Sequence, residues 1–206
     1  LIPEDPILTQ TLKHTDDRGY PDHLAVAPNQ GMLLQMLIQM NGCKRILELG
    51  TFAAYSTMWL ARALPEDGYI LTIEGRDAHA AVAQENIDQA KLKQTIDLRV
   101  GRAADILKSL PADTAPFDFI FIDADKQSYP EYLELSLNLS RSGTLIFLDN
   151  VIRAGDIINP DNHKPSIEGI REMFKLMQEH PRLLSSTALQ TVGSKGHDGF
   201  ALAIVK

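Results

Sequence analysis

The sequence predicts an α/β fold built on an open, mostly parallel sheet. Short runs rich in β-branched and aromatic residues alternate with stretches of helical periodicity along most of the 206 residues. Strand–helix–strand order implies parallel pairing with right-handed crossovers. Continuous apolar runs such as Phe119–Ile122 are typical of strands that helices cover on both faces of a sheet.

The elements before the first strand are expected to be helical. The polar, proline-containing segment 1–28 predicts an N-terminal cap of short helices and loops. Asn29 is a candidate N-cap for a helix that runs to about Met40, and Asn41-Gly42 should end it. The apolar stripe of this helix comprises Met32, Leu33, Met36, Leu37 and Met40.

The alternating region follows, with five strands and the helices between them. The expected strands are Arg45–Leu49, Tyr69–Ile73, Ile96–Val100, Phe117–Ile122 and Thr144–Leu148. The expected helices are Ser56–Ala63, Ala78–Ala90, Ala103–Leu110 and Tyr129–Leu139.

The C-terminal part predicts a helix over Ser166–Glu179 and then two strands, Leu183–Leu189 and Phe200–Val205. A link that contains Gly193, Gly196 and Gly199 joins them, which is typical of an antiparallel hairpin at a sheet edge. Because no internal linker is visible, residues 1–206 are expected to form a single domain.

Composition narrows the function classes. The formal net charge is −7 and the basic residues are scattered, which disfavours nucleic acid as a partner. Cys43 is the only cysteine, so an intramolecular disulfide is impossible. No apolar run reaches the roughly 18–20 residues that span a bilayer, so no membrane partner is expected. No signal peptide is visible, and a cytoplasmic location is expected.

Acidic residues stand at the ends of most predicted parallel strands, where ligands bind in open α/β sheets. They are Glu48, Glu74, Asp123, Asp125 and Asp149. Each could singly be a helix N-cap. Several carboxylates on one rim repel each other, however, and need a cation or hydrogen-bond donors.

The first strand ends in a turn that suits a ligand. Gly50 lets the backbone approach a bound molecule, and the following helix offers free N–H groups. A carboxylate at Glu74 can accept both hydroxyls of a ribose. The turn lacks the G-x-G-x-x-G spacing of a dinucleotide site. These features predict an adenosine-type ligand, either a nicotinamide dinucleotide or S-adenosylmethionine.

Asp123, Asp149 and Asn150 supply the oxygen ligands that a hard cation such as Mg²⁺ prefers. Three protein ligands leave about three of six octahedral positions open, enough for both oxygens of an ortho-diphenol and a water. Lys126 follows Asp123 closely enough to reach the same place. Singly, each residue could also be a surface or turn residue.

The chain resembles the metal-dependent O-methyltransferases of the catechol and caffeoyl-coenzyme A type from about Leu24 to Lys206. The motifs that carry the resemblance are Leu47–Ser56, Phe121–Lys126 and Leu148–Asn150. It implies a Rossmann-like methyltransferase fold, a seven-stranded sheet with an antiparallel last strand, a phenolic small-molecule acceptor and a homodimer.

The resemblance also implies roles for individual residues. Lys126 would be the general base, and Asp123, Asp149 and Asn150 would bind the divalent metal, Mg²⁺ or another ion such as Ca²⁺ or Mn²⁺. The residues expected to bind S-adenosylmethionine are Val26, Glu48, Gly50, Thr51, Ser56, Glu74, Ala103, Asp123 and Asp125.

The chain departs from the family at Ala54, where glycine is usual. If this position needs a positive φ, alanine costs roughly 1 kcal/mol. Three alternative functions stay open: a methyltransferase that acts on a non-phenolic acceptor, a nicotinamide-dinucleotide oxidoreductase, and a non-catalytic binding module, which Ala54 alone supports. Acceptor specificity is expected to lie in the segment before Val26, in the loop 151–165 with Arg153, and in the link 193–199.

Overall fold

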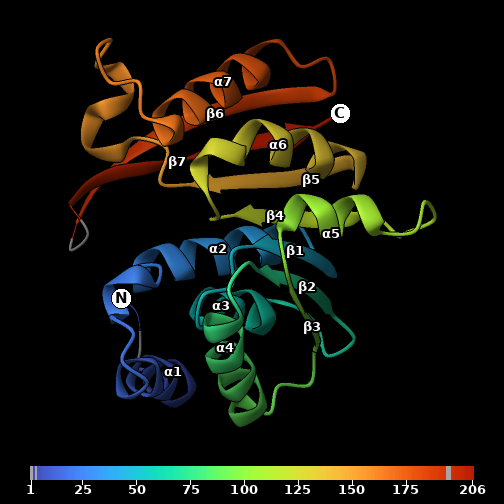
Figure 1. Cartoon of the computed structure of the whole chain (residues 1–206). Coiled ribbons are helices and arrows are strands. Elements are labelled where there is room, and N and C mark those ends of the chain that lie inside the picture. Colours follow the sequence, from blue (N-terminus) through green and yellow to red (C-terminus); the bar gives the residue numbers. More distant parts are fainter. Residues whose placement is uncertain (1, 3, 194–195) are drawn as a thin grey trace. The chain divides into compact units, whose positions relative to one another are not determined.

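The structure, a computed structural model, describes residues 2, 4–193 and 196–206, without the side chain of Asp22. Two compact units make up the chain, Leu1–Arg102 and Ala103–Lys206. The first is coloured blue to green and the second green to red in Figure 1. The single-domain organisation stays a prediction. Among the described helices, none is long and apolar enough to pass through a bilayer.

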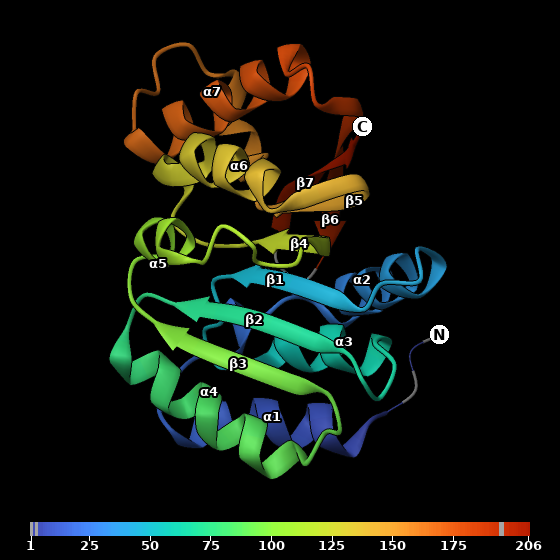
Figure 2. The same cartoon turned by 90° about the vertical axis from the view of Figure 1, so that its right-hand side faces the viewer.

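The first unit is a three-stranded parallel layer with helices packed on it. Its strands are β1 (Arg45–Leu49), β2 (Tyr69–Glu74) and β3 (Thr95–Val100), in the order β3-β2-β1. Figure 2 shows the three arrows side by side and pointing the same way. The helices are α1 (Pro6–Asp17), α2 (Pro28–Met40), α3 (Tyr55–Ala63) and α4 (Asp77–Ala90), with a 3-10 turn, η1, at Asp22–Leu24.

The second unit has four strands in the order β4-β5-β7-β6. They are β4 (Phe117–Ile122), β5 (Ser140–Asp149), β6 (Leu183–Gly193) and β7 (Gly196–Val205). Its helices are α5 (Ala103–Ser109), α6 (Tyr129–Asn138) and α7 (Pro165–Glu179), with 3-10 turns η2 (Lys126–Ser128) and η3 (Arg153–Ile158). α6 packs on β5 and α7 on β6, as Figure 1 shows.

The fold class predicted from the sequence is confirmed. The described residues form seven strands, and β7 runs antiparallel to both of its neighbours, β5 and β6. β4 is buried along its whole length, as its uninterrupted apolar run predicts. Most predicted boundaries fall within one or two residues of the observed ones.

Two predictions for α2 were wrong. Its N-cap is Ala27, because Pro28 occupies the first helical turn, where its fixed φ and missing N–H are tolerated. The buried face consists of Gly31, Leu34 and Ile38, whereas Met40 of the predicted stripe is 81% exposed. This face packs on α3, where a Cβ at Gly31 would lie 2.5 Å from Nε1 of Trp59.

The C-terminal hairpin is longer than predicted. Pairing continues outward until Gly193 lies opposite Gly196, so both glycines, and Gly199 as well, belong to strands. Residues 194 and 195 of the predicted link lie outside the described residues. The strand β6 is exposed along nearly all of its length. A strand that is exposed on both faces needs no apolar–polar alternation, so a sequence pattern does not mark where it ends.

Candidate active site

The ends of β4 and β5 bring two carboxylates together in the second unit. The last paired residues of these parallel strands are Ile122 and Leu148, so Asp123 and Asp149 come next on neighbouring strands. Adjacent strands lie about 4.8 Å apart. Asp149 is buried and Asp123 is partly exposed. The sequence prediction that these two acids share one rim agrees with this register.

Lys126 is held against Asp123 by the 3-10 turn η2. Its Nζ atom donates to Oδ1 of Asp123 at 2.7 Å and lies 2.6 Å from the hydroxyl of Tyr129. The lysine is only 9% exposed. A buried ammonium is tolerated only when it is paired and hydrogen-bonded, and both conditions are met here.

Tyr129 connects the lysine to the two strand ends. Its hydroxyl lies 3.0 Å from the carbonyl oxygen of Ile122 and 2.8 Å from that of Asp149. Burial, followed by the negative charges of Asp123 and Asp149, raises the pKa of Tyr129 well above its usual range. The phenol therefore stays neutral: it accepts from Lys126 and donates to one carbonyl at a time. We did not predict this residue from the sequence.

Asn150 follows Asp149 with a φ of 55°, a left-handed conformation that asparagine tolerates better than most residues. Its N–H donates to Oδ1 of Asp149 at 2.8 Å. The next turn is fixed by β7, because Oδ1 of Asp198 accepts from the N–H groups of Ile152 and Arg153, each at 3.0 Å. No signal in the sequence pointed to Asp198.

The donor set at this rim fits a hard divalent cation in its chemistry. Two carboxylates and one amide oxygen, from Asp123, Asp149 and Asn150, are ligands of the type that Mg²⁺ and Ca²⁺ take. Within residues 2, 4–193 and 196–206, no group of three or more His, Cys, Asp or Glu side chains is arranged to hold a metal. The predicted set contains only two such side chains.

The other predicted cofactor residues of this unit lie at helix starts. Asp125 precedes η2 and accepts from the hydroxyl of Tyr132 at 2.5 Å. Ala103 is the first residue of α5 and is buried. A role of both residues at an adenine ring stays a prediction.

In the first unit, β1 passes into α3 through the turn 50–54. Gly50 has a φ of 94°, and its N–H donates to the carbonyl of Ile73 at 2.9 Å. Phe52 and Ala54 also have positive φ, 50° and 64°. The condition that makes alanine costly at position 54 is therefore met.

Glu48 lies beneath this turn, fully buried. Its carboxylate accepts from the hydroxyls of Ser56 and Thr57 at 2.6 Å each and from that of Thr72 at 2.7 Å. The hydroxyl of Thr51 lies 2.6 Å from that of Thr72. A buried carboxylate with three donors is a stable anchor for the turn.

Glu74 ends β2 and also contacts the turn. Its Oε2 accepts from the N–H of Phe52 at 2.7 Å, and its Oε1 accepts from the N–H of Arg76 at 3.0 Å. Nδ1 of His79 lies 3.5 Å from Oε1. Val26, the remaining predicted contact, is buried just before α2. The predicted residues Glu48, Thr51, Ser56 and Glu74 of this unit are thus joined through one hydrogen-bonded turn.

Comparison with known proteins gives consistent matches. A family profile described as O-methyltransferase matches residues 2–203. A catechol O-methyltransferase of Niastella koreensis is 48% identical over 98% of this chain and 91% of its own length. The O-methyltransferase of Bacillus cereus, solved in complex with SAH, is 47% identical with a TM-score of 0.95, covering 100% of this chain and 93% of that one.

A third match is the O-methyltransferase TomG of Streptomyces achromogenes, solved in complex with SAM. It is 40% identical, with a TM-score of 0.93, and the alignment covers 100% of this chain and 92% of that one. These matches favour methyl transfer over the nicotinamide-dependent alternative. The chain is an enzyme that belongs to the O-methyltransferase family.

Proposed function

We propose that this enzyme transfers the methyl group of S-adenosylmethionine to a hydroxyl of a catechol-type small molecule, with a divalent cation at the acceptor. The observation that carries the proposal is the pairing of Nζ of Lys126 with Oδ1 of Asp123 at 2.7 Å, beside the neighbouring strand end at Asp149. It puts the side-chain nitrogen of Lys126, which can accept a proton in its neutral amine form, next to an oxygen-rich rim. The relatives named above support the donor and the catechol class of acceptor.

The first unit would bind the donor. The turn 50–54 and the start of α3 would hold the charged methionine end, because the first N–H groups of a helix favour a negatively charged group. Glu74 would accept the ribose hydroxyls. Because Glu48 is fully buried, its part in donor binding would be to hold Ser56 and the turn.

The second unit would activate the acceptor. A free phenol has a pKa of roughly 10, so little phenolate exists at neutral pH. A cation bound by Asp123, Asp149 and Asn150 would stabilise the phenolate and fix the position of its oxygen. Lys126, in its neutral amine form, would take the phenolic proton, and Tyr129 would keep the lysine in place through its hydroxyl.

In the transfer itself, the phenolate oxygen forms a bond to the methyl carbon while the sulfur–carbon bond breaks. The products are the methyl ether and S-adenosylhomocysteine. Bringing the two reactants to near-attack distance supplies much of the rate. The negative charge of the phenolate and the positive charge of the sulfonium are both neutralised during the transfer, so excluding water from the site assists the step.

Methyl transfer to a panel of catechols, with and without Mg²⁺ and chelator, tests this proposal. Asp149→Ala should abolish metal-dependent turnover, and Lys126→Ala should lower kcat by about 10²–10⁴-fold. Full activity in chelator would remove the cation from the proposal. Equal kcat values for Lys126→Ala and the unaltered enzyme would rule out Lys126 as the general base.

The expected homodimer is also part of the proposal. β6 carries exposed apolar side chains, including Leu184 and Val192, which a second copy could cover. Size-exclusion chromatography with light scattering would test it, and a monomer at micromolar concentration would contradict it.

A further inference from the structure

The segment 153–164 lies between the candidate metal ligand Asn150 and α7, and its backbone is unusual. Arg153, Ala154 and Gly155 have φ values of 54°, 56° and 88°, three successive left-handed residues. Only the glycine adopts this conformation without strain. Strained backbone of this kind persists only where surrounding contacts hold it.

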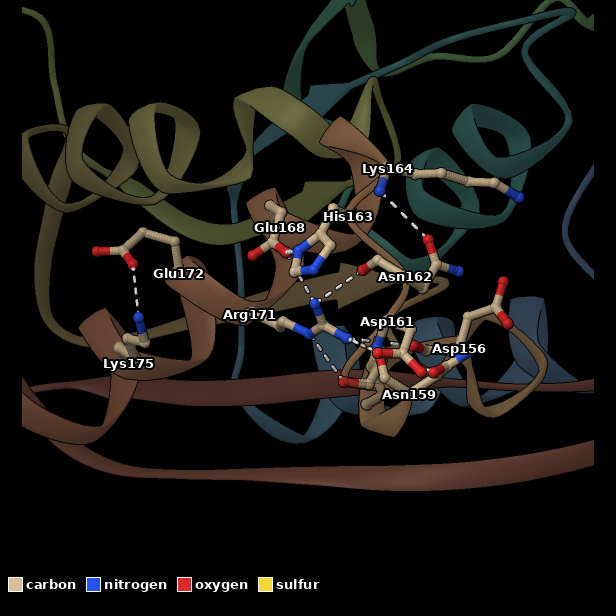
Figure 3. Close-up of polar contacts among 11 residues, drawn as sticks. Asp156, Asn159, Asp161, Asn162, His163, Lys164, Glu168, Arg171, Glu172 and Lys175 are labelled. Carbon is tan, nitrogen blue, oxygen red and sulfur yellow. Dashed lines mark hydrogen bonds and ion pairs between the residues drawn. The ribbon is translucent and has the colours of Figure 1, made fainter.

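One side chain of α7, Arg171, makes four hydrogen-bonding contacts to backbone carbonyls in the rest of this segment. Nε of Arg171 donates to the carbonyl of Ile157 at 3.0 Å. Nη1 donates to the carbonyl of Asn162 at 2.9 Å, and Nη2 to that of Asn159 at 2.5 Å, with the carbonyl of Asp156 at 3.5 Å. Figure 3 shows the segment curling around this guanidinium.

The arrangement uses what is particular to arginine. A guanidinium presents five N–H donors in a rigid plane, whereas an ammonium is a compact point charge. Carbonyls spread over residues 156–162 therefore converge on one flat group, which fixes the path of the whole segment. Glu168 accepts from Nη1 at 2.9 Å and keeps the plane oriented.

A solvated surface arginine would look different. Arg171 is 22% exposed at its side chain, although it stands on an outer helix. Lys175, one turn further along α7, is 70% exposed, and within the part of the chain that the structure describes its ammonium reaches only the carboxylate of Glu172, at 3.2 Å. The two residues share a helix and a charge, but only Arg171 organises a neighbouring segment.

We propose that Arg171 is a positioning residue for acceptor recognition: it holds 156–162 as a preformed wall beside the metal ligands. This inference rests on the proposed function. The wall carries Ile158, whose side chain is 83% exposed, and an aromatic acceptor ring would bury it. Without the guanidinium the segment would have to be ordered by each acceptor molecule, which weakens acceptor binding.

The test compares Arg171→Ala, Arg171→Lys and the control Lys175→Ala in steady-state methyl transfer to a catechol. Arg171→Ala should raise the acceptor KM about tenfold or more, with KM for S-adenosylmethionine within about twofold. Arg171→Lys should recover part of the loss, because one ammonium replaces only some of the contacts. Lys175→Ala should behave as the unaltered enzyme.

Two further measurements keep the outcomes apart. Hydrogen exchange of the peptide that covers 153–164 should accelerate in Arg171→Ala and not in Lys175→Ala. Affinity for S-adenosylhomocysteine, measured by calorimetry, shows that each variant is folded. If Arg171→Ala does not fold, Arg171→Lys carries the comparison and should still raise the acceptor KM.

An unchanged acceptor KM in a folded Arg171 variant would overturn the inference while leaving the proposed function intact. An equal rise in KM for the acceptor and for S-adenosylmethionine would overturn it too, since such a result would indicate a general structural effect. No turnover of any catechol by the unaltered enzyme would instead refute the proposed function, and the role of Arg171 in acceptor recognition with it.

Discussion

Nζ of Lys126 lies 2.6 Å from the hydroxyl of Tyr129, and that hydroxyl also reaches the carbonyl of Asp149 at 2.8 Å. The lysine is thereby tied to the end of β5 as well as to Asp123 at the end of β4. Contacts therefore link the position of Lys126 to the strand ends that carry Asp123 and Asp149. Tyr129 is for this reason a positioning residue of the candidate site.

Tyr129→Phe should lower kcat by about 10-fold to 100-fold, because Lys126 loses one of its two partners. The free energy of unfolding should fall by about 1–3 kcal/mol, since a buried carbonyl loses its donor. KM for S-adenosylmethionine should change little. Steady-state kinetics and urea unfolding measure the three quantities.

Tyr132→Phe is the comparison variant, since its hydroxyl bonds to Asp125 and not to the lysine. Tyr132→Phe should leave kcat nearly unchanged. If Asp125 binds the adenine, the substitution should raise KM for S-adenosylmethionine. A fall in stability for Tyr129→Phe with an unaltered kcat would reduce Tyr129 to a purely structural residue.

Gly169→Ala should disturb the site from the opposite side. A Cβ there would lie 2.4 Å from the carbonyl oxygen of Lys126 and 2.7 Å from Cα of Gln127, so α7 and η2 would have to separate. Such overpacking costs about 1–3 kcal/mol, and kcat should fall as Lys126 shifts. Thermal unfolding and kinetics would measure both effects.

Gly193→Ala is a suitable control for that substitution, because no atom of the described residues lies within 4 Å of the Cβ it would add. It should change stability by less than about 0.5 kcal/mol. Equal stability of the Gly169 and Gly193 variants would contradict the close approach of α7 to η2.

The parallel core was predictable because burial on both faces leaves a direct trace in the sequence. The run Phe117–Ile122 is apolar almost throughout, and β4 has those bounds. The burial of α2 was not predictable in the same way. Its apolar residues exceed what one face can hold, and the choice of Leu34 and Ile38 over Met36 and Met40 is made by the fit of Gly31 to Trp59.

The residues of the candidate site also fall into a group that the sequence predicts and a group that it does not. Asp123 and Asp149 each follow directly after a strand, so their place along the sequence was enough to predict that they lie at the same edge of the sheet. Tyr129, Asp198 and Arg171 contact backbone carbonyls and N–H groups of other segments, 9 to 46 residues away along the chain. Every residue offers the same backbone groups, so no spacing of residue types could reveal which ones these side chains reach.

The order of 156–162 should weaken in acid. Chiefly the hydrogen bond from His163, and to a lesser degree the charge and hydrogen bond of Arg171, hold the pKa of Glu168 below its ordinary value. A lowered carboxyl pKa stabilises the fold above the unfolded pKa, and this contribution is lost as pH falls through the folded pKa. A carbon-detected NMR titration should show the pKa of Glu168 rise in His163→Ala. An unchanged value would remove that hydrogen bond as the cause.

Ala54→Gly tests the departure of this chain from its family. The φ of 64° costs alanine roughly 1 kcal/mol, but glycine would give up a buried methyl group worth about 0.8 kcal/mol. The two terms nearly cancel, so the free energy of unfolding should change by less than about 1 kcal/mol. Because Ala54 is 0% exposed, its methyl group offers no surface to a ligand, and affinity for S-adenosylmethionine should stay within about twofold. Urea unfolding and calorimetric titration give the two values. If the glycine variant bound S-adenosylmethionine ten times more tightly, Ala54 would be shown to crowd the donor site.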